Sequence, residues 1–259
     1  METNKAKENH DKIIQWIKDW FKDKENYSAI VGISGGKDST VCAALLAEAL
    51  GPKRVYGVEM PNGEQKDISD SDKVIETLGI QKTVVNIGEA YKALSKEIHN
   101  QGLICENKSL YTTNTPARLR MVTLYGVAAT VQGLVCNTCN LSESIVGWET
   151  YGGDGFGDFA PIGRLTKTEV VELGDYMELP QELVHKAPSD GMCGATDEDK
   201  LGFTYETLDN YIRKGLRPKA KETFDRIMSL HKKSHFKHEN IRIPTCDIGA
   251  VICEDFDWD

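Results

Sequence analysis

The sequence predicts an α/β fold, a doubly wound parallel sheet with extra helices at its C-terminal end. Residues 29–33 are a short apolar run rich in β-branched residues, typical of a buried strand. The run leads through a serine and two glycines into a helical pattern over residues 38–50. Two more strand patterns, over residues 54–60 and 83–87, alternate with helical segments. This alternation indicates parallel strands with helices on both faces of the sheet.

The remaining elements follow from the same periodicities and from capping residues. Pro116 after Thr115 predicts that a long apolar helix begins there, because proline is favoured at a first helical position. Thr166 and Glu169 have the spacing of a capping box. The other predicted elements are a helix over residues 10–21, a loop over 100–110, a strand over 133–138, glycine-rich or irregular loops over 151–158 and 185–201, and helices over 204–212 and 219–232.

The bulk composition favours one globular domain spanning residues 1–259. The chain is 40% hydrophobic and 27% charged, and these are globular values. A formal net charge of −9 argues against nucleic acid or a membrane surface as a partner. The first 15 residues lack the apolar core of a signal peptide, which predicts a cytoplasmic protein. The uncharged stretch 121–142 is too rich in polar residues for a membrane span.

The seven cysteines are expected to be reduced thiols. Cys136 and Cys139 form a CxxC pair, which occurs in redox sites and in zinc sites. A second CxxC or a suitably spaced histidine pair is absent from the sequence. The favoured interpretation is therefore that both are small buried apolar residues.

The segment Ser34–Ser39, SGGKDS, predicts a phosphate site. A strand, a glycine turn and the start of a helix direct backbone N–H groups and the positive end of a helix dipole at one point. In a parallel sheet this point lies beyond the carboxyl ends of the strands, where ligands bind. The pattern differs from both the dinucleotide GxGxxG and the Walker motif.

SGGKDS resembles the pyrophosphate-binding loop of enzymes that cleave ATP between its α and β phosphates. Further segments resemble, in order, the ammonia-dependent NAD synthetases of that superfamily: MPNGEQKD, NTPARLRM, YGGDGFGDFAPIGRLTK, KAPSDG and DEDKLGFTYETLDNYI. The resemblance covers almost the whole chain. It implies a Rossmann-like fold of the adenine-nucleotide α-hydrolase type, a homodimer and no glutaminase domain. It also implies that ammonia is joined to the carboxylate of deamido-NAD, through an adenylate formed from ATP.

The resemblance also implies roles for particular residues. Asp38 and Glu143 would hold Mg²⁺, and Lys167 would neutralise ATP phosphate charge; Asp38, Lys167 and Ser189 are the catalytic candidates. Without the resemblance, Asp38 would be interpreted as an acid at a helix N-terminus, and Glu143 and Lys167 as charged surface residues. The implied ATP contacts are Gly32, Ile33, Ser34, Gly35, Gly36, Lys37, Asp38, Ser39, Thr138, Lys167 and Ser189. The implied contacts to deamido-NAD are Arg118, Tyr151, Asp158, His238 and Glu239.

The chain departs from the family pattern at several of these positions. Thr138 lies in NTC rather than GTD, and Ser189 replaces a threonine, so both keep a hydroxyl. Tyr151 replaces a lysine, and Glu239 replaces the lysine of a His-Lys pair. Two alternatives therefore stay open. One is another reaction of the same loop, such as tRNA thiolation or a different amide synthesis, and the other is a nucleotide-binding regulator without catalysis.

Overall fold

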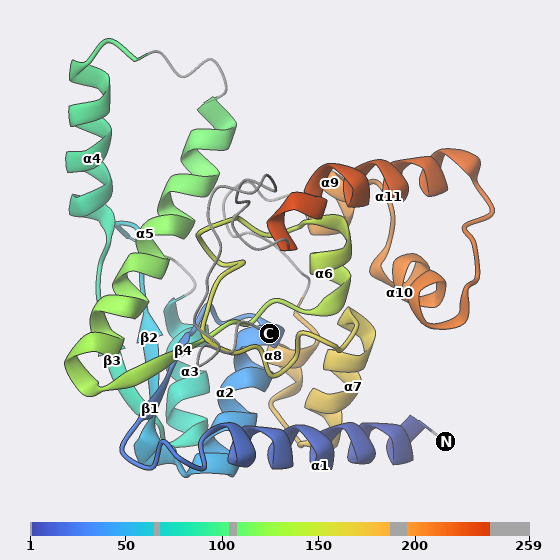
Figure 1. The fold of residues 1–259 in the computed structure, drawn as a ribbon, viewed down its shortest axis with the longest axis horizontal. Helices are drawn as coiled ribbons and strands as arrows, with labels where there is room; N and C mark the ends of the chain where they lie inside the picture. Colours follow the sequence, from blue (N-terminus) through green and yellow to red (C-terminus); the bar gives the residue numbers. More distant parts are fainter. Residues whose placement is uncertain (1, 65–67, 104–107, 187–195, 239–259) are drawn as a thin grey trace, which may run out of the picture.

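Four parallel strands form the centre of the computed structural model, in the order β3-β2-β1-β4 (Figure 1). The structure describes residues 2–64, 68–103, 108–186 and 196–238. The strands are β1 (Ser28–Gly32), β2 (Val55–Glu59), β3 (Gln81–Val84) and β4 (Gly133–Cys136). The helices are α1 (Glu2–Trp20), α2 (Lys37–Leu50), α3 (Ile68–Leu78), α4 (Gly88–Asn100), α5 (Lys108–Val131), α6 (Leu141–Val146), α7 (Lys167–Tyr176), α8 (Gln181–Val184), α9 (Asp197–Leu201), α10 (Tyr205–Lys214) and α11 (Lys221–Ser234), with 3-10 helices η1 (Pro52–Arg54) and η2 (His235–His238).

The strand order places β1 at a topological switch point. Ala29 is in register with Val55 of β2 on one side and with Leu134 of β4 on the other. The chain passes from β1 outward to β2 and β3, and only later returns to β4 on the opposite side. Loops at the carboxyl end of β1 therefore open into the crevice where α/β sheets bind ligands.

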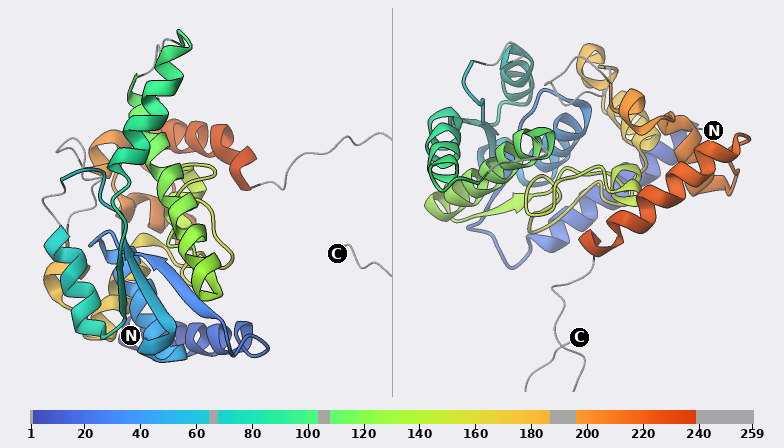
Figure 2. Two further views of the ribbon diagram at one scale, coloured as in Figure 1. Left: turned by 90° about the vertical axis from the view of Figure 1, so that its left-hand side faces the viewer. Right: turned by 90° about the horizontal axis from the view of Figure 1, so that it is seen from above.

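Helices cover both faces of this sheet, which confirms the predicted doubly wound architecture (Figures 1 and 2). Ile30 and Val31 are both fully buried, but they belong to different cores because alternate strand residues point to opposite faces. Val31 packs in the larger core with residues of α1, α2 and α7. Ile30 packs in a smaller core with Met121 and Leu124 of α5. Each such side chain contributes about 1.5–3 kcal/mol on burial.

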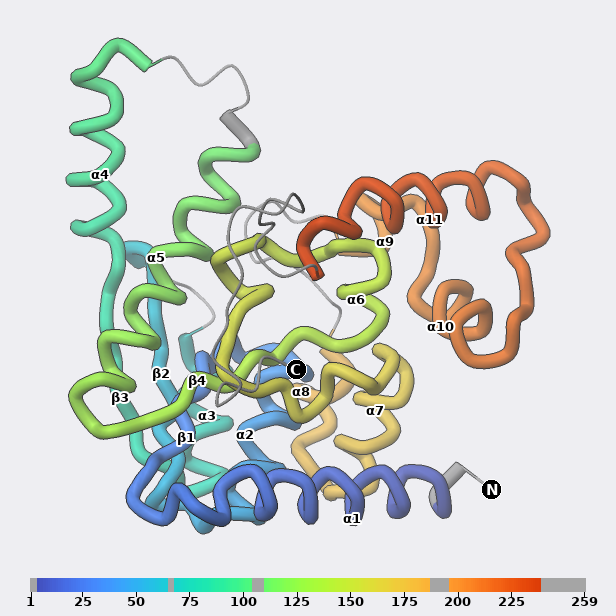
Figure 3. Tube along the Cα trace, viewed as in Figure 1, coloured from blue at the N-terminus to red at the C-terminus, as the bar shows by residue number. Residues whose placement is uncertain are grey.

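The C-terminal helices form a separate cluster beside the sheet (Figure 3). Leu201 of α9, Leu208 of α10 and Ile227 of α11 pack around Val146 of α6. Thr204 caps α10, so the predicted terminal helices are confirmed with small shifts of their ends. The cluster matters for the site because α6 carries Glu143, one of the predicted metal ligands.

The structure corrects the predicted start of the long helix. α5 begins at Lys108, so Pro116 lies inside it rather than at its first position. Part of the predicted loop over 100–110 is therefore helical. The preceding helix α4 packs beside the early part of α5, where Ser95 Oγ and Tyr111 Oη are 2.8 Å apart. α4 therefore packs against the turns of α5 that precede Thr115 and Pro116, where the local capping signals predicted the helix to begin. α1 likewise begins at Glu2, earlier than predicted.

The stretch 121–142 is shared among α5, β4 and the start of α6. Among the described residues, no helix combines the length and the hydropathy that crossing a bilayer requires.

Candidate active site

The phosphate loop is built by β1, which ends at Gly32, and by α2, which begins at Lys37. Its two serines hold it in shape: Ser34 Oγ and Ser39 Oγ are 3.1 Å apart, and Ser39 Oγ donates to the Gly36 carbonyl at 3.0 Å. Gly36 is the N-cap of α2 and supplies no side-chain cap. The first N–H groups of α2 are therefore not capped by a side chain from that position and can face an anion.

Gly35 is the position where this loop requires glycine. Its φ is +73°, and a Cβ there would lie 2.8 Å from Cβ of Asp70 and 3.2 Å from the Ser71 nitrogen. A larger residue would meet both backbone strain and the start of α3. Ser71 Oγ also donates to the Ile33 carbonyl at 3.1 Å, so α3 supports the loop from the side.

Three predicted site residues converge although they come from distant segments. Lys167 Nζ lies 2.7 Å from Asp38 Oδ2 and 2.7 Å from Glu143 Oε1. Lys167 is buried and Asp38 and Glu143 are partly buried, with side-chain exposures of 6%, 18% and 12% respectively. The surface interpretations of Lys167 and Glu143 are therefore wrong. α2, α6 and α7 each place one member in the first turn of the helix.

Helix capping orients this cluster. Asn140 caps α6 by accepting from the Glu143 backbone N, and Glu143 Oε2 accepts from the Asn140 backbone N. Asn140 Nδ2 also donates to Asp38 Oδ1 at 2.9 Å. One capping residue thus holds both carboxylates. The predicted capping box at Thr166 and Glu169, which starts α7 just before Lys167, is confirmed.

A buried network behind Lys167 joins its helix to the C-terminal cluster. Asp209 of α10 accepts from Ser142 Oγ at 2.5 Å and from the Thr168 backbone N at 2.8 Å. Ser142 Oγ also accepts from the Lys167 backbone N at 3.0 Å. The ring of Tyr205 lies 5.1 Å from Lys167 Nζ. These contacts anchor the backbone at the start of α7, so that the Lys167 side chain extends toward the two carboxylates.

The electrostatics of the cluster favour a charged lysine. Burial opposes the ammonium form of Lys167, but Glu143 and Asp38 outweigh burial and raise its pKa well above the ordinary value. Burial also raises the pKa of Glu143, and Lys167 partly opposes that rise. Lys37, in the phosphate loop, has its pKa lowered by burial and by Lys167. Two lysines, Lys37 and Lys167, therefore lie near the uncapped start of α2, where a polyphosphate would need cations.

Asp38 and Glu143 also have the chemistry of a magnesium pair. Both direct an oxygen at the same Lys167 nitrogen, so the two carboxylates approach one another. Mg²⁺ in nucleotide enzymes is held by one or two carboxylates together with substrate phosphates. Among the described residues, no group of three or more His, Cys, Asp and Glu side chains is arranged to hold a metal alone. The donor set therefore fits an ion that arrives with a nucleotide.

The predicted substrate residues lie around the loop 151–158, which forms hydrogen-bonded turns. Arg118 is exposed, and its Nε donates to the Tyr151 carbonyl at 3.1 Å. The Tyr151 ring lies 6.0 Å from that of Phe236. Asp158 is used internally: its oxygens accept from the Val135 N at 2.7 Å and the Tyr125 hydroxyl at 3.0 Å. Thr138 is partly buried between β4 and α6, whereas Ser189 and Glu239 lie outside the described residues.

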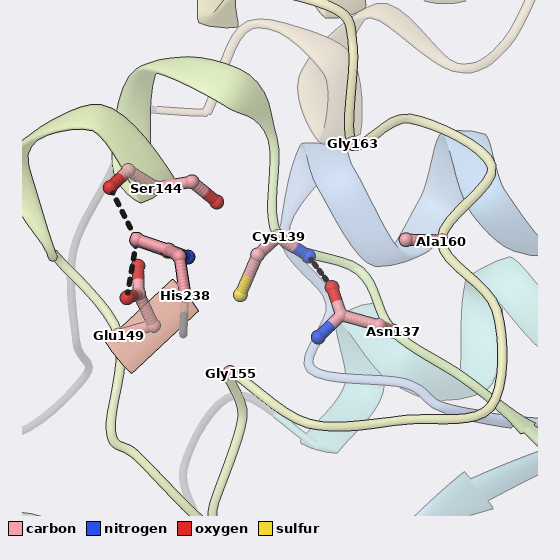
Figure 4. A pocket seen from close by; sticks show the side chains of 8 residues that line it. All are labelled: Asn137, Cys139, Ser144, Glu149, Gly155, Ala160, Gly163 and His238. Carbon is pink, nitrogen blue, oxygen red and sulfur yellow. Dashed lines mark hydrogen bonds and ion pairs between the residues drawn. The ribbon is translucent and has the colours of Figure 1, made fainter. Parts of the chain in front are cut away.

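Sequence reasoning missed Glu149, which lines a cavity of about 320 Å³ with His238 (Figure 4). Its side chain is 3% exposed, and no group in the described part of the chain forms a hydrogen bond with either carboxylate oxygen. His238 Nε2 lies 2.8 Å from the Ser144 carbonyl and 3.6 Å from Glu149 Oε1. Burial raises the pKa of Glu149 to about 7, although Lys237 opposes this. A glutamate between Trp148 and a threonine carries no sequence signal of burial.

A second pocket lies on the exposed side of α5. It measures about 370 Å³ and is lined by Met121, Val122, Tyr125, Tyr151, Gly152 and Phe156. Val122 is 69% exposed and Phe156 is 53% exposed, so a largely apolar face is left uncovered. This face belongs to the long apolar helix α5, and the family resemblance implies a homodimer.

The two cysteines of the CxxC pair have the environment of structural residues. Cys136 and Cys139 are both buried and free. Cys139 Sγ donates to the Asp154 carbonyl at 3.3 Å, and burial raises its thiol pKa well above the ordinary value. A buried thiol held in its neutral form is a poor nucleophile and a poor metal ligand.

Known proteins similar to this chain belong to one enzyme family. The family model described as NAD synthase matches residues 9–241. The chain is 36% identical over 239 residues to the NH(3)-dependent NAD(+) synthetase of Carboxydothermus hydrogenoformans, covering 92% of this chain and 97% of that protein.

Two solved structures share the fold over nearly their full length. The structure of NMN synthetase from Francisella tularensis has a TM-score of 0.85 and 32% identity, covering 93% of this chain and 99% of that one. The NH3-dependent NAD synthetase from Campylobacter jejuni, in complex with the nitrate ion, has a TM-score of 0.73 and 26% identity, covering 92% and 98%.

Proposed function

This chain belongs to the NAD synthase family, and we propose that it joins ammonia to the carboxylate of deamido-NAD with ATP, giving NAD, AMP and pyrophosphate. It is a ligase that forms a C–N bond. The roles of the residues are assigned from one observation. Lys167 contacts both Asp38 and Glu143 beside the uncapped start of α2. That geometry provides one site for phosphate charge and for the ion that accompanies it.

The chemistry explains why phosphates are needed. A carboxylate cannot be aminated directly, because its leaving group would be an oxide. In the first step a carboxylate oxygen bonds to the α-phosphorus of ATP, and the bond from that phosphorus to the bridging oxygen breaks. Pyrophosphate departs with the electron pair. Ammonia then attacks the acyl carbon, AMP leaves, and the nitrogen loses one proton.

The residues of this chain would contribute mainly by position and charge. The N–H groups that open α2 would receive the departing pyrophosphate, with the hydroxyls of Ser34 and Ser39 shaping the loop. Lys167 would stabilise the charge that gathers on phosphate oxygens. Lys37 would add a second cation at the mouth of the same loop. Thr138, at the end of β4, and Ser189 would provide hydrogen bonds to ATP.

Asp38 and Glu143 would hold Mg²⁺, which supplies charge neutralisation of the phosphates when it is bound. Lys167, whose ammonium now lies between the two carboxylates, would then turn toward phosphate oxygens. Retention of all three residues argues against a nucleotide-binding regulator without catalysis. The family match argues against tRNA thiolation, since it extends over residues 9–241.

The exposed face of α5 and the pocket at Val122 support a homodimer, with the substrate site near the interface. The single described fold, with its cores on both faces of one sheet, supports one synthetase domain. A cytoplasmic location is consistent with ATP and deamido-NAD as substrates.

The second candidate substrate is nicotinic acid mononucleotide, and one observation favours it. The solved structure with a TM-score of 0.85 is that of an NMN synthetase. The chain also departs from the family at Tyr151 and Glu239, two positions assigned to the dinucleotide rather than to ATP. Both reactions use the same phosphate loop and differ only in the carboxylate donor.

The deciding experiment supplies purified protein with ATP, Mg²⁺ and ammonium, and with deamido-NAD or the mononucleotide in parallel. We expect kcat/KM to be larger for deamido-NAD, which gives NAD, than for the mononucleotide. A preference for the mononucleotide would move the assignment to NMN synthesis. Failure to amidate either substrate would refute the proposed function.

A further inference from the structure

Arg120 lies at the reactive edge of the sheet, although it has no assigned role. It is one helical turn before Leu124 on α5, and its Nε donates to the carbonyl of Met60, which follows β2, at 3.1 Å. Met60 and Leu124 both approach Gly32: a Cβ there would be 3.0 Å from Met60 Cε and 3.6 Å from Leu124 Cδ1. The guanidinium therefore contacts Met60, whose side chain packs against Gly32 where β1 enters the phosphate loop.

Among the described residues, the terminal nitrogens of Arg120 have no hydrogen-bond acceptor. A guanidinium has five N–H donors. Within the described residues, only Nε of Arg120 donates a hydrogen bond, and its acceptor is a neutral carbonyl. The two Nη groups, which form the fork that matches carboxylates and phosphates, have no acceptor there.

Two other arginines of this chain donate through a terminal nitrogen as well as through Nε. Arg54 donates through Nε and Nη2 to the carbonyls of Tyr27 and Lys24. Arg213 forms a forked contact with Glu169, in which Nε lies 3.0 Å and Nη2 2.5 Å from carboxylate oxygens. Both donate through Nε and Nη2 to groups that hold the fold together. Arg120 is partly buried and, among the described residues, donates through Nε alone.

The charge of Arg120 is also poorly balanced. Burial lowers its pKa, and Asp154 is the acid that opposes this effect. Asp154 directs its carboxylate to the Thr150 backbone N at 3.1 Å rather than to the guanidinium. A partly buried cation without a hydrogen-bonded anion is costly to a fold. The cost is removed when an anion binds between the Nη groups.

We infer that the Nη groups of Arg120 hold a pair of anionic oxygens of the substrates during adenylation. The oxygens come from the carboxylate being activated or from the α-phosphate of ATP, both of which must meet beside the phosphate loop. This inference rests on the proposed function. Arg118 has a different setting, because it is exposed and bound to the Tyr151 carbonyl. Arg120 moves no proton in this role; it positions the two reacting groups.

The test measures adenylation separately from amidation. Exchange of labelled pyrophosphate into ATP, with Mg²⁺ and the carboxylate substrate but without ammonium, reports the first step alone. We expect Arg120→Gln to lower the exchange rate about 100-fold, the loss typical for a group that stabilises reacting oxygens. The rate at which the adenylate, once formed, reacts with ammonia should stay unchanged, since ammonia enters after the adenylate forms. Arg226→Gln is the matched control, because Arg226 is exposed and also donates through Nε to one carbonyl, that of Leu201.

The KM values identify the source of the oxygens. A rise in KM for the carboxylate substrate alone indicates its carboxylate, and a rise for ATP alone indicates the α-phosphate. Arg120→Lys should recover part of the activity and remain about tenfold impaired, since an ammonium keeps the charge but not the fork. This variant also serves if the glutamine variant fails to fold.

Exchange within about threefold of wild type in a folded Arg120→Gln protein, with unchanged KM values, would overturn the inference. Full activity of Arg120→Lys would contradict the paired contact. Neither result touches the proposed function, which stands or fails on amidation by the wild-type protein.

Discussion

The ammonium of Lys167 lies 2.7 Å from Oδ2 of Asp38, although 129 residues separate them in the chain. Asn140 holds the other oxygen of Asp38, and Glu143 contacts the same ammonium. Two carboxylates and one lysine therefore share a buried position at the start of α2. Removal of one charge should disturb the others, because each is desolvated and depends on the rest.

Asp38→Asn should reduce turnover by at least about 100-fold while the protein stays folded. The amide keeps the size of the side chain but loses the charge that binds a metal ion and pairs with Lys167. Steady-state NAD formation and circular dichroism provide the measurement. Asp225→Asn, an exposed substitution on α11, is the control and should behave as wild type. Near-normal activity of folded Asp38→Asn would disprove the role of this carboxylate.

Val122→Asp should convert a dimer into a monomer. Val122 is 69% exposed beside the apolar pocket on α5, so a charge there would be buried without a partner at the proposed interface. Light scattering at assay concentration measures the change. Leu216→Asp is a matched control, because Leu216 is 58% exposed on the connection between α10 and α11. A wild-type monomer would refute the proposed dimer.

Glu149→Gln should stabilise the protein at alkaline pH and not at acid pH. Burial raises the pKa of Glu149 to about 7 from 4.5, so the folded state keeps a proton that the unfolded state has lost. The contribution of Glu149 to the free energy of unfolding of the wild-type protein is therefore fully present below about pH 4.5 and is lost as the pH rises through 7. The gain in Tm for the glutamine variant should reach a few °C at pH 8. A gain that is equal at pH 5 and pH 8 would contradict the assignment to this carboxyl.

Ammonia, and not glutamine, should support NAD formation by the purified chain. Release of ammonia from glutamine requires an activated nucleophile such as a cysteine thiolate. Cys42 and Cys139 are buried, and burial raises the pKa of each well above the ordinary value, so neither serves. NAD formation from ammonia-free glutamine would overturn this prediction.

The rate at fixed total ammonium should rise with pH from neutral toward mildly alkaline. Ammonium cannot attack the adenylate because its lone pair is occupied, so the neutral fraction sets the supply. The rate is measured at subsaturating ammonium with ATP and deamido-NAD saturating. A flat profile between pH 7 and 8.5 would show that the enzyme removes the proton itself.

The sequence alone determined the central sheet and the phosphate loop, since both depend on local patterns. An apolar strand followed by SGGKDS specifies a turn and a helix start within one short segment, and the structure has both. The capping boxes are equally local, as Thr166 and Glu169 demonstrate. The family resemblance then identified Asp38, Glu143 and Lys167 without any knowledge of their positions in space.

Tertiary structure alone decided which charges are satisfied. Glu143 and Lys167 resemble surface residues in the sequence, and burial by α2, α6 and α7 makes them a single charged cluster. Arg118 and Arg120 are two residues apart and chemically identical. Arg118 is exposed, whereas Arg120 is partly buried near the end of β2, and its terminal nitrogens have no acceptor in the part of the chain that the structure describes. The difference arises because a helix turns by about 100° per residue, so near neighbours in sequence point to different faces and meet different partners.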